Sequence, residues 1–195
     1  METKTVYFET PGKEHTDTVL ALVNVRATEL GIKTVLVAST TGFAAVKALE
    51  ALKGLRVVII THCAGASESN TQEFTEANRK IVESNGGIIH TATQIFSGIN
   101  QAFRQGTIPN PPSHYVPGDL MAATLRLFGH GMKAACEISA MAADAGLVRT
   151  DEEVIAIAGT SAGGRGSDTA IVVQPANAHH IFELKVKEII CKPRL

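Results

Sequence analysis

Residues 35–45 read VLVASTTGFAA. The pattern predicts a β-branched apolar strand that ends in three hydroxyl residues and a glycine, followed by an alanine-rich helix. This order directs main-chain N–H groups, hydroxyls and the positive end of a helix dipole at one place, formed by Ser39, Thr40, Thr41 and Gly42. Such a place suits a phosphate or a carboxylate. The stretch therefore predicts an anion-binding α/β domain.

Length and composition describe an ordinary globular chain. With 195 residues, of which 45% are hydrophobic and 19% charged, we expect one domain over residues 1–195. The net charge of -1 supplies no field for a nucleic acid, so no nucleic-acid partner is expected. No apolar stretch approaches the roughly 20 residues that cross a bilayer, which predicts no membrane partner. Three widely spaced cysteines without a CxxC pair indicate a reduced, cytoplasmic setting.

Strand and helix patterns alternate along most of the chain. Strands are expected near residues 5–9 and over 34–38, 56–61, 88–91 and 154–158, and helical patterns separate them. This alternation is typical of βαβ units with helices on both faces of a sheet. Only about ten residues separate the strand at 154–158 from the next one, at 169–173, so these two are expected to pair antiparallel. The predicted fold is an α/β class, three-layer α/β/α sandwich with a mostly parallel mixed sheet. A last apolar strand at 186–191 is suited to pairing across subunits, which leaves a homo-oligomer open.

Three helix starts follow from capping signals. Thr16 is expected to cap the first long helix, and Asn70 with Glu73 resembles a capping box for the helix that follows the strand at 56–61. Asp119 is expected to cap a long helix that runs past Cys136 and is bent at Gly129 and Gly131. The preceding segment, 104–118, holds four of the seven prolines and is interpreted as a functional or subunit-contact loop.

Four predicted strand ends are polar: STTG at 39–42, THCAG at 61–65, TATQ at 91–94 and GTSAGG at 159–164. In an open α/β sheet, ligands gather beyond the carboxyl ends of the strands. One shared polar pocket explains four such ends better than four ordinary loops do. Beside residues 39–42, the candidate lining residues are His62, Gly65, Thr91, Thr93, Thr160, Gly163 and Gly164.

Several residues admit a second interpretation. His62 is a candidate general base or stacking group, or equally a histidine satisfied by loop backbone. Cys63 is better explained as a small buried hydrophobe than as a nucleophile. Lys133 and Glu137 have the spacing of a plain i,i+4 ion pair on one helix. Asp168 is interpreted as ordering the glycine-rich loop or binding a ligand hydroxyl.

Comparison with known sequence motifs limits the classes of site that the chain is expected to contain. Residues 159–163 match G-x-S-x-G, but a nucleophile elbow is followed by a helix, and here glycines and a strand follow. A glycine-rich clasp over a phosphate fits this segment better. The chain contains neither GxGxxG nor GxxxxGK[ST], so the dinucleotide-binding and P-loop signatures are missing. No cluster of histidines and cysteines predicts a metal site.

Two segments resemble the C-terminal α/β domain of pyruvate kinase: residues 35–45 with the strand at 57–60, and DEEVIAIAG at 151–159 with DTA at 168–170. In that family the hydroxyl-rich turn holds a phosphate of an allosteric sugar bisphosphate. Phe43 stands here where the family usually has an arginine, and Arg165 is a candidate to supply the missing charge. The resemblance does not extend to the catalytic barrel, so no pyruvate kinase activity is expected.

More closely, the chain resembles a group of stand-alone pyruvate kinase α/β-domain proteins of archaea and bacteria, on AADAGL at 142–147 and EVIAIAGT at 153–160. This resemblance implies flavin mononucleotide (FMN) as the cofactor or ligand. The first hypothesis is therefore a module, a flavoprotein, that binds a phosphorylated small molecule. The alternative is a small flavin-dependent or phospho-metabolite enzyme that uses His62 or Asp168 for proton transfer.

Overall fold

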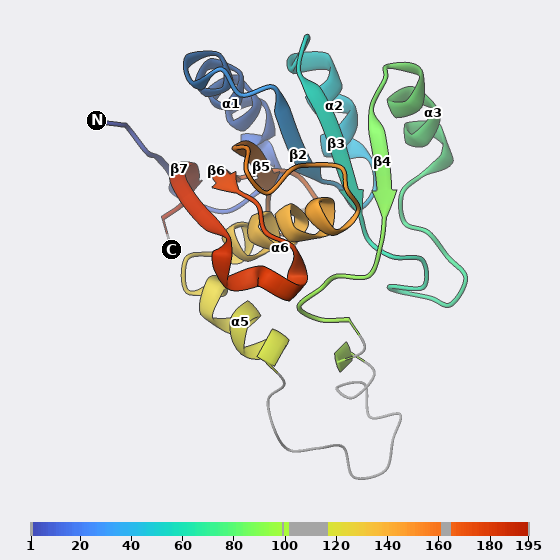
Figure 1. Ribbon diagram of the computed structural model, residues 1–195. Helices are drawn as coiled ribbons and strands as arrows, with labels where there is room; N and C mark the ends of the chain where they lie inside the picture. Colours follow the sequence, from blue (N-terminus) through green and yellow to red (C-terminus); the bar gives the residue numbers. More distant parts are fainter. Residues whose placement is uncertain (1, 99, 102–116, 161–164, 195) are drawn as a thin grey trace.

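A seven-stranded mixed sheet forms the centre of the computed structural model, which describes residues 2–98, 100–101, 117–160 and 165–194 (Figure 1). The strand order is β1-β7-β6-β5-β2-β3-β4. Neighbouring strands run parallel except where β6 pairs with β5 and with β7. The strands are β1 (Val6–Phe8), β2 (Thr34–Ala38), β3 (Arg56–Thr61), β4 (Ile88–Thr91), β5 (Val154–Ala158), β6 (Thr169–Gln174) and β7 (Lys185–Pro193).

Helices cover both faces of this sheet (Figure 1). One face carries α1 (Thr16–Leu30), α2 (Phe43–Ala51) and α3 (Glu76–Ser84). The other face carries α6 (His130–Asp144), against which α5 (Pro117–Arg126) packs. Two short 3-10 helices, Lys13–His15 and Ala178–Glu183, precede α1 and β7. The three-layer α/β/α class predicted from the sequence is confirmed.

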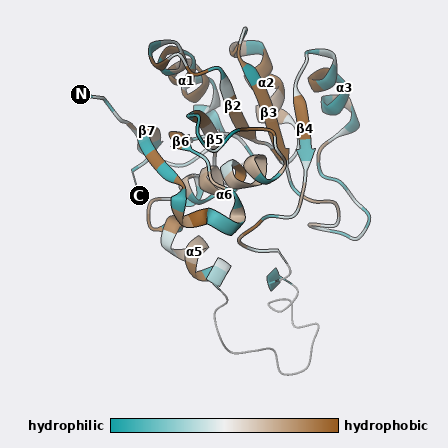
Figure 2. Cartoon of the chain, in the orientation of Figure 1, coloured by the Kyte–Doolittle hydropathy of each residue, from teal (hydrophilic) through white to brown (hydrophobic). Residues whose placement is uncertain are grey.

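Alternate residues of the central strands supply two separate cores. In β2, Val35 and Val37 join the cluster beneath α1 and α2, whereas Leu36 joins the cluster beneath α6. All three are 0% exposed, so this strand is apolar on both faces. Figure 2 shows β2 and β3 in hydrophobic colours for this reason. The continuous apolar runs in the sequence thus follow from burial on both sides.

Close packing of α6 on the sheet depends on Gly131. A Cβ atom at this position would lie 2.1 Å from the Thr169 hydroxyl oxygen on β6. Gly131 lies inside α6, and the break in the helical pattern falls two residues earlier, at Gly129. Gly129, with φ of 113°, separates α5 from α6, so the single long helix expected after Asp119 is wrong. α5 begins at Pro117, whose fixed φ suits a first turn, and Asp119 lies within that turn instead of capping it.

The other two expected caps are also wrong. Thr16 donates its hydroxyl to the carbonyl of Lys13 and accepts from the amide of Ser167, so it braces two segments instead of capping α1. α3 begins at Glu76, and its cap is Thr75, which accepts from the amide of Asn78. Asn70 adopts a left-handed φ of 64° in a turn, too early for the helix.

The last strand is not the free edge that its sequence suggested. β7 is paired with β6 along one side and with β1 at Cys191 to Pro193, so the sheet edges are β1 and β4. A homo-oligomer stays a prediction. Residues 104–116 of the proline-rich loop lie outside the described residues. Among the residues described, no helix has the length and apolar character needed to cross a bilayer.

Candidate functional site

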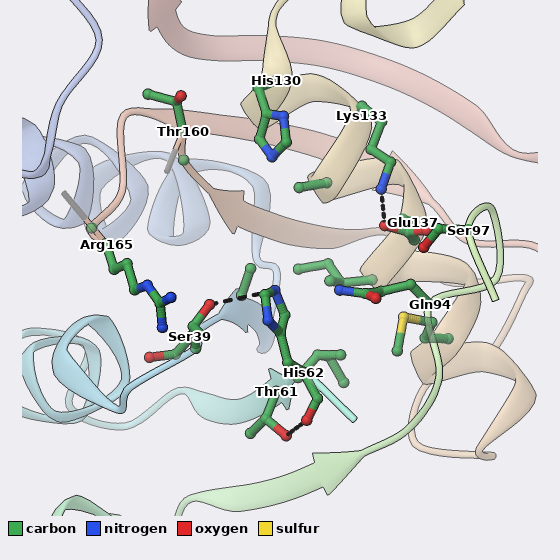
Figure 3. Close-up of a pocket in the computed structure, with 18 of the residues that line it drawn as sticks. Ser39, Thr61, His62, Gln94, Ser97, His130, Lys133, Glu137, Thr160 and Arg165 are labelled. Carbon is green, nitrogen blue, oxygen red and sulfur yellow. Dashed lines mark hydrogen bonds and ion pairs between the residues drawn. The ribbon is translucent and has the colours of Figure 1, made fainter. Parts of the chain in front are cut away.

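A cavity of about 510 Å³ opens at the carboxyl ends of β2, β3 and β5. One wall is formed by residues that follow these strands, and the opposite wall by α6 (Figure 3). The sheet wall contributes Ser39, Thr40, Thr61, His62, Gly159 and Thr160, and the segment after β5 adds Arg165 and Gly166. The position agrees with the general rule for ligand sites in open α/β sheets.

The turn between β2 and α2 borders this cavity through Ser39 and Thr40. The Ser39 amide donates to the Ile60 carbonyl at 3.0 Å, and the Ser39 hydroxyl accepts from the Ala45 amide at 3.3 Å. Between them, the amides of residues 40–44 have no acceptor within the described part of the chain. Amides without an acceptor among the described residues are therefore found at 40–44, in the centre of the turn. The amides at its two ends, those of Ser39 and Ala45, are bonded within the protein.

α3 supports this turn from behind. The Thr41 carbonyl accepts from the Thr75 amide at 3.2 Å and from the Asn78 side-chain amide at 2.9 Å. Gly42 has φ of 98°, and a Cβ there would lie 2.4 Å from the Asn78 Cβ. A glycine is required by both the backbone conformation and the close approach of α3.

His62, directly after β3, is held by an acid that sequence reasoning assigned to a helix cap. Its Nδ1 lies 2.9 Å from Oε2 of Glu73, and its Nε2 lies 3.5 Å from the Thr40 hydroxyl. Glu73 Oε1 accepts a second hydrogen bond, from the Arg165 guanidinium. The interpretation of His62 as a residue satisfied only by loop backbone is wrong, because its ring bonds to side chains.

Glu73 is mostly buried, with a side chain that is 16% exposed. Burial raises the pKa of its carboxyl group, but the hydrogen bonds from Arg165 and His62 outweigh burial and leave the pKa below its ordinary value. Glu73 is therefore a carboxylate at neutral pH.

The α6 wall contains a buried ion pair. The Lys133 ammonium donates to Oε2 of Glu137, and Oε1 of Glu137 accepts from the Phe96 amide at 3.0 Å. The two side chains are 8% and 4% exposed. The i,i+4 pairing expected from the sequence is confirmed, but the pair lines the cavity instead of a solvated helix face.

His130 and Arg126 complete the α6 side of the cavity. The pKa of His130 is lowered, first by partial burial of the ring and then by the charges of Lys133 and Arg126, which outweigh the nearby carboxylates. The ring is therefore held neutral at pH values where a free histidine begins to take up a proton.

The structure places the predicted site residues differently relative to the cavity. Ser39, Thr40, His62 and Thr160 line the cavity, and Thr41 and Gly42 lie in the turn beside it. Thr91 shares a hydrogen bond of 2.7 Å with Thr61, and neither it nor Gly65 and Thr93 is among the lining residues. Gly163 and Gly164 lie outside the described residues.

Asp168 lies outside the cavity lining. It is 1% exposed, and it accepts from the Thr169 hydroxyl at 2.8 Å and from the Thr160 amide at 3.3 Å. Burial raises the pKa of this carboxyl group in spite of the hydrogen bonds to it. Of its two interpretations, these contacts favour ordering the start of the glycine-rich segment.

Cys63 is half-buried, not fully buried as expected, whereas Cys136 and Cys191 are buried. Burial raises the pKa of Cys136 to about 11 and that of Cys191 to about 12, so both remain thiols. No group of three histidine, cysteine, aspartate or glutamate residues suited to a metal occurs in the described part of the chain.

Sequence reasoning missed the α6 wall. Its polar lining residues within α6, His130, Lys133 and Glu137, follow one another at intervals of three and four positions, and Arg126 lies at the end of α5. That spacing places polar side chains on one stripe of an otherwise buried helix, and this signal was available in the sequence. Glu73 had no comparable signal, because it lies in a loop and meets its partners only through the fold.

No family model matches the chain. Among solved structures, it is similar to Cryptosporidium parvum pyruvate kinase in complex with ADP, with a TM-score of 0.40 and 11% sequence identity. The match covers 83% of this chain and 24% of that chain, so this chain spans about a quarter of the pyruvate kinase. A likeness this distant carries no argument about function.

Proposed function

We propose that this chain binds a phosphorylated small molecule in the cavity at the carboxyl edge of the sheet, with FMN as the first candidate. The observation that carries the proposal is that Ser39 and Thr40 border a predominantly basic cavity lining, in a turn whose amides at 40–44 have no acceptor among the described residues. Ser39, Thr40, Thr41 and Gly42 would hold the phosphate.

The charges of the lining favour an anion. Its described residues include three basic side chains, Arg126, Lys133 and Arg165, against one carboxylate, Glu137. Lys133 is paired with Glu137 and Arg165 with Glu73, but the Arg165 side chain is 45% exposed, against 8% for Lys133, so Arg165 is better placed to reach a phosphate. A charge-assisted hydrogen bond from a guanidinium to a phosphate is stronger than a neutral one.

The remaining surface fits a ligand with a flat apolar body. Beside the polar groups, the cavity is lined by Ile60, Ile138 and Met141 and by the rings of His62 and His130. A volume of about 510 Å³ lies within the range for cofactor-sized ligands. These features support FMN among phosphorylated ligands, in line with the resemblance noted from the sequence.

The test compares FMN, riboflavin and inorganic phosphate as ligands of the purified protein, by flavin fluorescence and by melting temperature. We expect FMN to bind and stabilise, and riboflavin, which lacks the phosphate, to bind at least about tenfold more weakly, since one charge-assisted bond contributes about 1.5–3 kcal/mol. Equal affinity for FMN and riboflavin would contradict a phosphate site. Failure of every phosphorylated compound to raise the melting temperature would contradict the whole proposal.

A variant pair separates Arg165 from general charge effects. Arg165→Gln should weaken FMN about tenfold or more. Arg79→Gln removes the same charge from α3, away from the cavity lining, and should leave the affinity unchanged.

The second candidate is a small flavin-dependent or phospho-metabolite enzyme. The contact between His62 Nδ1 and Glu73 favours it, because an oriented histidine at a cavity is the usual arrangement of a general base. His62→Ala should then lower any flavin-dependent turnover of the unaltered protein by a larger factor than it lowers FMN affinity. Absence of turnover in the unaltered protein would favour the binding module.

Membership of the stand-alone pyruvate kinase α/β-domain group and a cytoplasmic location are parts of the same proposal. The expectation that the chain has no pyruvate kinase activity also stays a prediction.

A further inference from the structure

Glu73 uses its two carboxylate oxygens for two different donors. Oε1 accepts from Nη1 of Arg165, and Oε2 lies 2.9 Å from Nδ1 of His62. His62 and Glu73 lie at the two ends of the connection between β3 and α3, and Arg165 lies between β5 and β6. The Gln72 side chain donates to the His62 carbonyl at 3.1 Å and so holds the two ends of the β3–α3 connection together.

A carboxylate accepts hydrogen bonds and donates none, so the proton at this contact belongs to His62 Nδ1. Glu73 is ionised at neutral pH, as its lowered pKa requires. A neutral imidazole with its proton on Nδ1 has a lone pair on Nε2. That atom lies 3.5 Å from the Thr40 hydroxyl, at the limit of a hydrogen bond, in a ring that lines the cavity.

We propose that Glu73, fixed in orientation by Arg165, is a positioning residue that holds neutral His62 as the Nδ1–H tautomer and so presents Nε2 to the cavity as a proton acceptor.

This inference deepens the proposed function and, for the nature of the ligand, rests on it. The part of the phosphorylated ligand that meets His62 is a donor, an O–H or an N–H group. Where the proton is transferred, it leaves that group for Nε2, the electron pair stays on the ligand, and the imidazolium formed is stabilised by the Glu73 carboxylate. Among the described lining residues, Lys133 and Glu137 lie on α6 in the opposite wall (Figure 3), and Arg126 is the last residue of α5.

Long-range ¹H–¹⁵N correlation spectra of the ¹⁵N-labelled, ligand-free protein test the tautomer directly. They are recorded at an alkaline pH at which the ring signals no longer change with pH. His62 is assigned by its absence in His62→Gln. We expect the Nδ1–H pattern, and an Nε2–H pattern in the unaltered protein would overturn the proposal without any further variant.

The Glu73→Gln variant tests the positioning role more sharply than the unaltered protein does. Arg165 donates, so the amide oxygen of the new side chain must face Arg165, and the NH₂ group must face His62. That NH₂ donates to Nδ1 and moves the ring proton to Nε2. We therefore expect the tautomer to switch in Glu73→Gln, and an unchanged Nδ1–H pattern would overturn the positioning role.

The double variant Glu73→Gln with Arg165→Leu tests whether Arg165 sets the orientation. Without the guanidinium the amide is free to turn its oxygen to His62, so the preference for Nε2–H should be lost, and its persistence would overturn the role of Arg165. Glu76→Gln removes an exposed carboxylate from the first turn of α3 and is the matched control; it should leave the tautomer unchanged.

These spectra and the FMN binding test allow the positioning role of Glu73 and the proposed function to fail independently. An Nδ1–H tautomer in a protein that binds no phosphorylated compound would retain the positioning role and refute the proposed function. Binding of FMN to a protein with the Nε2–H tautomer would support the proposed function and refute the positioning role.

Discussion

The side-chain amide of Asn78, in α3, donates to the main-chain carbonyl of Thr41 at 2.9 Å. The bond joins the helix after β3 to the turn after β2. A carbonyl held in this way fixes the peptide plane that it shares with the amide of Gly42. The arrangement of the proposed phosphate site therefore depends on a residue that does not line the cavity.

Asn78→Ala should lower the free energy of unfolding by about 1 kcal/mol, the contribution of one such hydrogen bond, and should also weaken FMN binding. Urea unfolding and fluorescence titration measure the two effects. Asn85→Ala, which removes a comparable amide-to-carbonyl bond at the other end of α3, is the control. It should cost stability with no change in affinity, and equal losses of affinity in both variants would show that the turn is not specifically supported by Asn78.

Gly42→Ala is expected to be more damaging than an alanine at another left-handed glycine. Each substitution costs about 1–2 kcal/mol for the strained backbone. At Gly42 the new Cβ also lies 2.4 Å from the Asn78 Cβ, whereas at Gly54, with φ of 82°, it meets nothing within 4 Å. Thermal and urea unfolding should rank Gly42→Ala below Gly54→Ala, and only Gly42→Ala should lose FMN binding. Retention of full affinity in Gly42→Ala would contradict the proposed phosphate site.

The Lys133–Glu137 pair should show strong non-additivity. Lys133→Met leaves a buried carboxylate without its cation, which costs about 3–5 kcal/mol. The double variant Lys133→Met with Glu137→Gln removes both charges and keeps an acceptor for the Phe96 amide, so its stability should return to within about 1–2 kcal/mol of the unaltered protein. A double-mutant cycle by urea unfolding measures the coupling. Additive losses would show that the pair is solvated.

His130 should titrate below the ordinary histidine pKa of about 6.5, because of partial burial and the charges of Lys133 and Arg126. As the pH falls, the unfolded chain takes up this proton before the folded one does. The contribution of His130 to stability is therefore present above about 6.5 and is lost as the pH falls through the folded-state pKa. NMR titration of the ring should show the lowered midpoint, and Arg126→Gln should raise it, whereas Arg149→Gln, at an exposed pair elsewhere, should not. A midpoint at or above the ordinary value would contradict this electrostatic description.

The fold was predictable because local patterns and tertiary structure agree in most of the chain. The runs at 35–38, 57–60 and 154–158 are apolar on both faces, and only a sheet covered on both sides buries them. Helix caps were predicted less reliably, because the side chains of Thr16 and Glu73 bond to residues brought near by the fold, and the sequence alone does not show these contacts. The place of β7 inside the sheet depends on pairing with β1, at the opposite end of the chain, and no local pattern encodes it.

Of the candidate site, only the wall formed by the strand ends could be predicted from the sequence. Ser39, Thr40, His62 and Thr160 follow β2, β3 and β5, and parallel strands bring their carboxyl ends to one edge. The segment after β4 reaches the cavity through Gln94 and Ser97, but Thr91 and Thr93 are exposed and do not line it. The opposite wall comes from a helix whose polar stripe resembles a surface face, and only the packing of α6 shows that it is buried.

The most direct test of the central claim is an amide NMR titration of the ligand-free protein with FMN, with inorganic phosphate and riboflavin in parallel. We predict that the amide resonances of residues 40–44 shift on addition of FMN, and of phosphate at higher concentration, but not on addition of riboflavin. Binding of FMN that leaves these amides unshifted, or the absence of any shift in the cavity residues, would contradict the account.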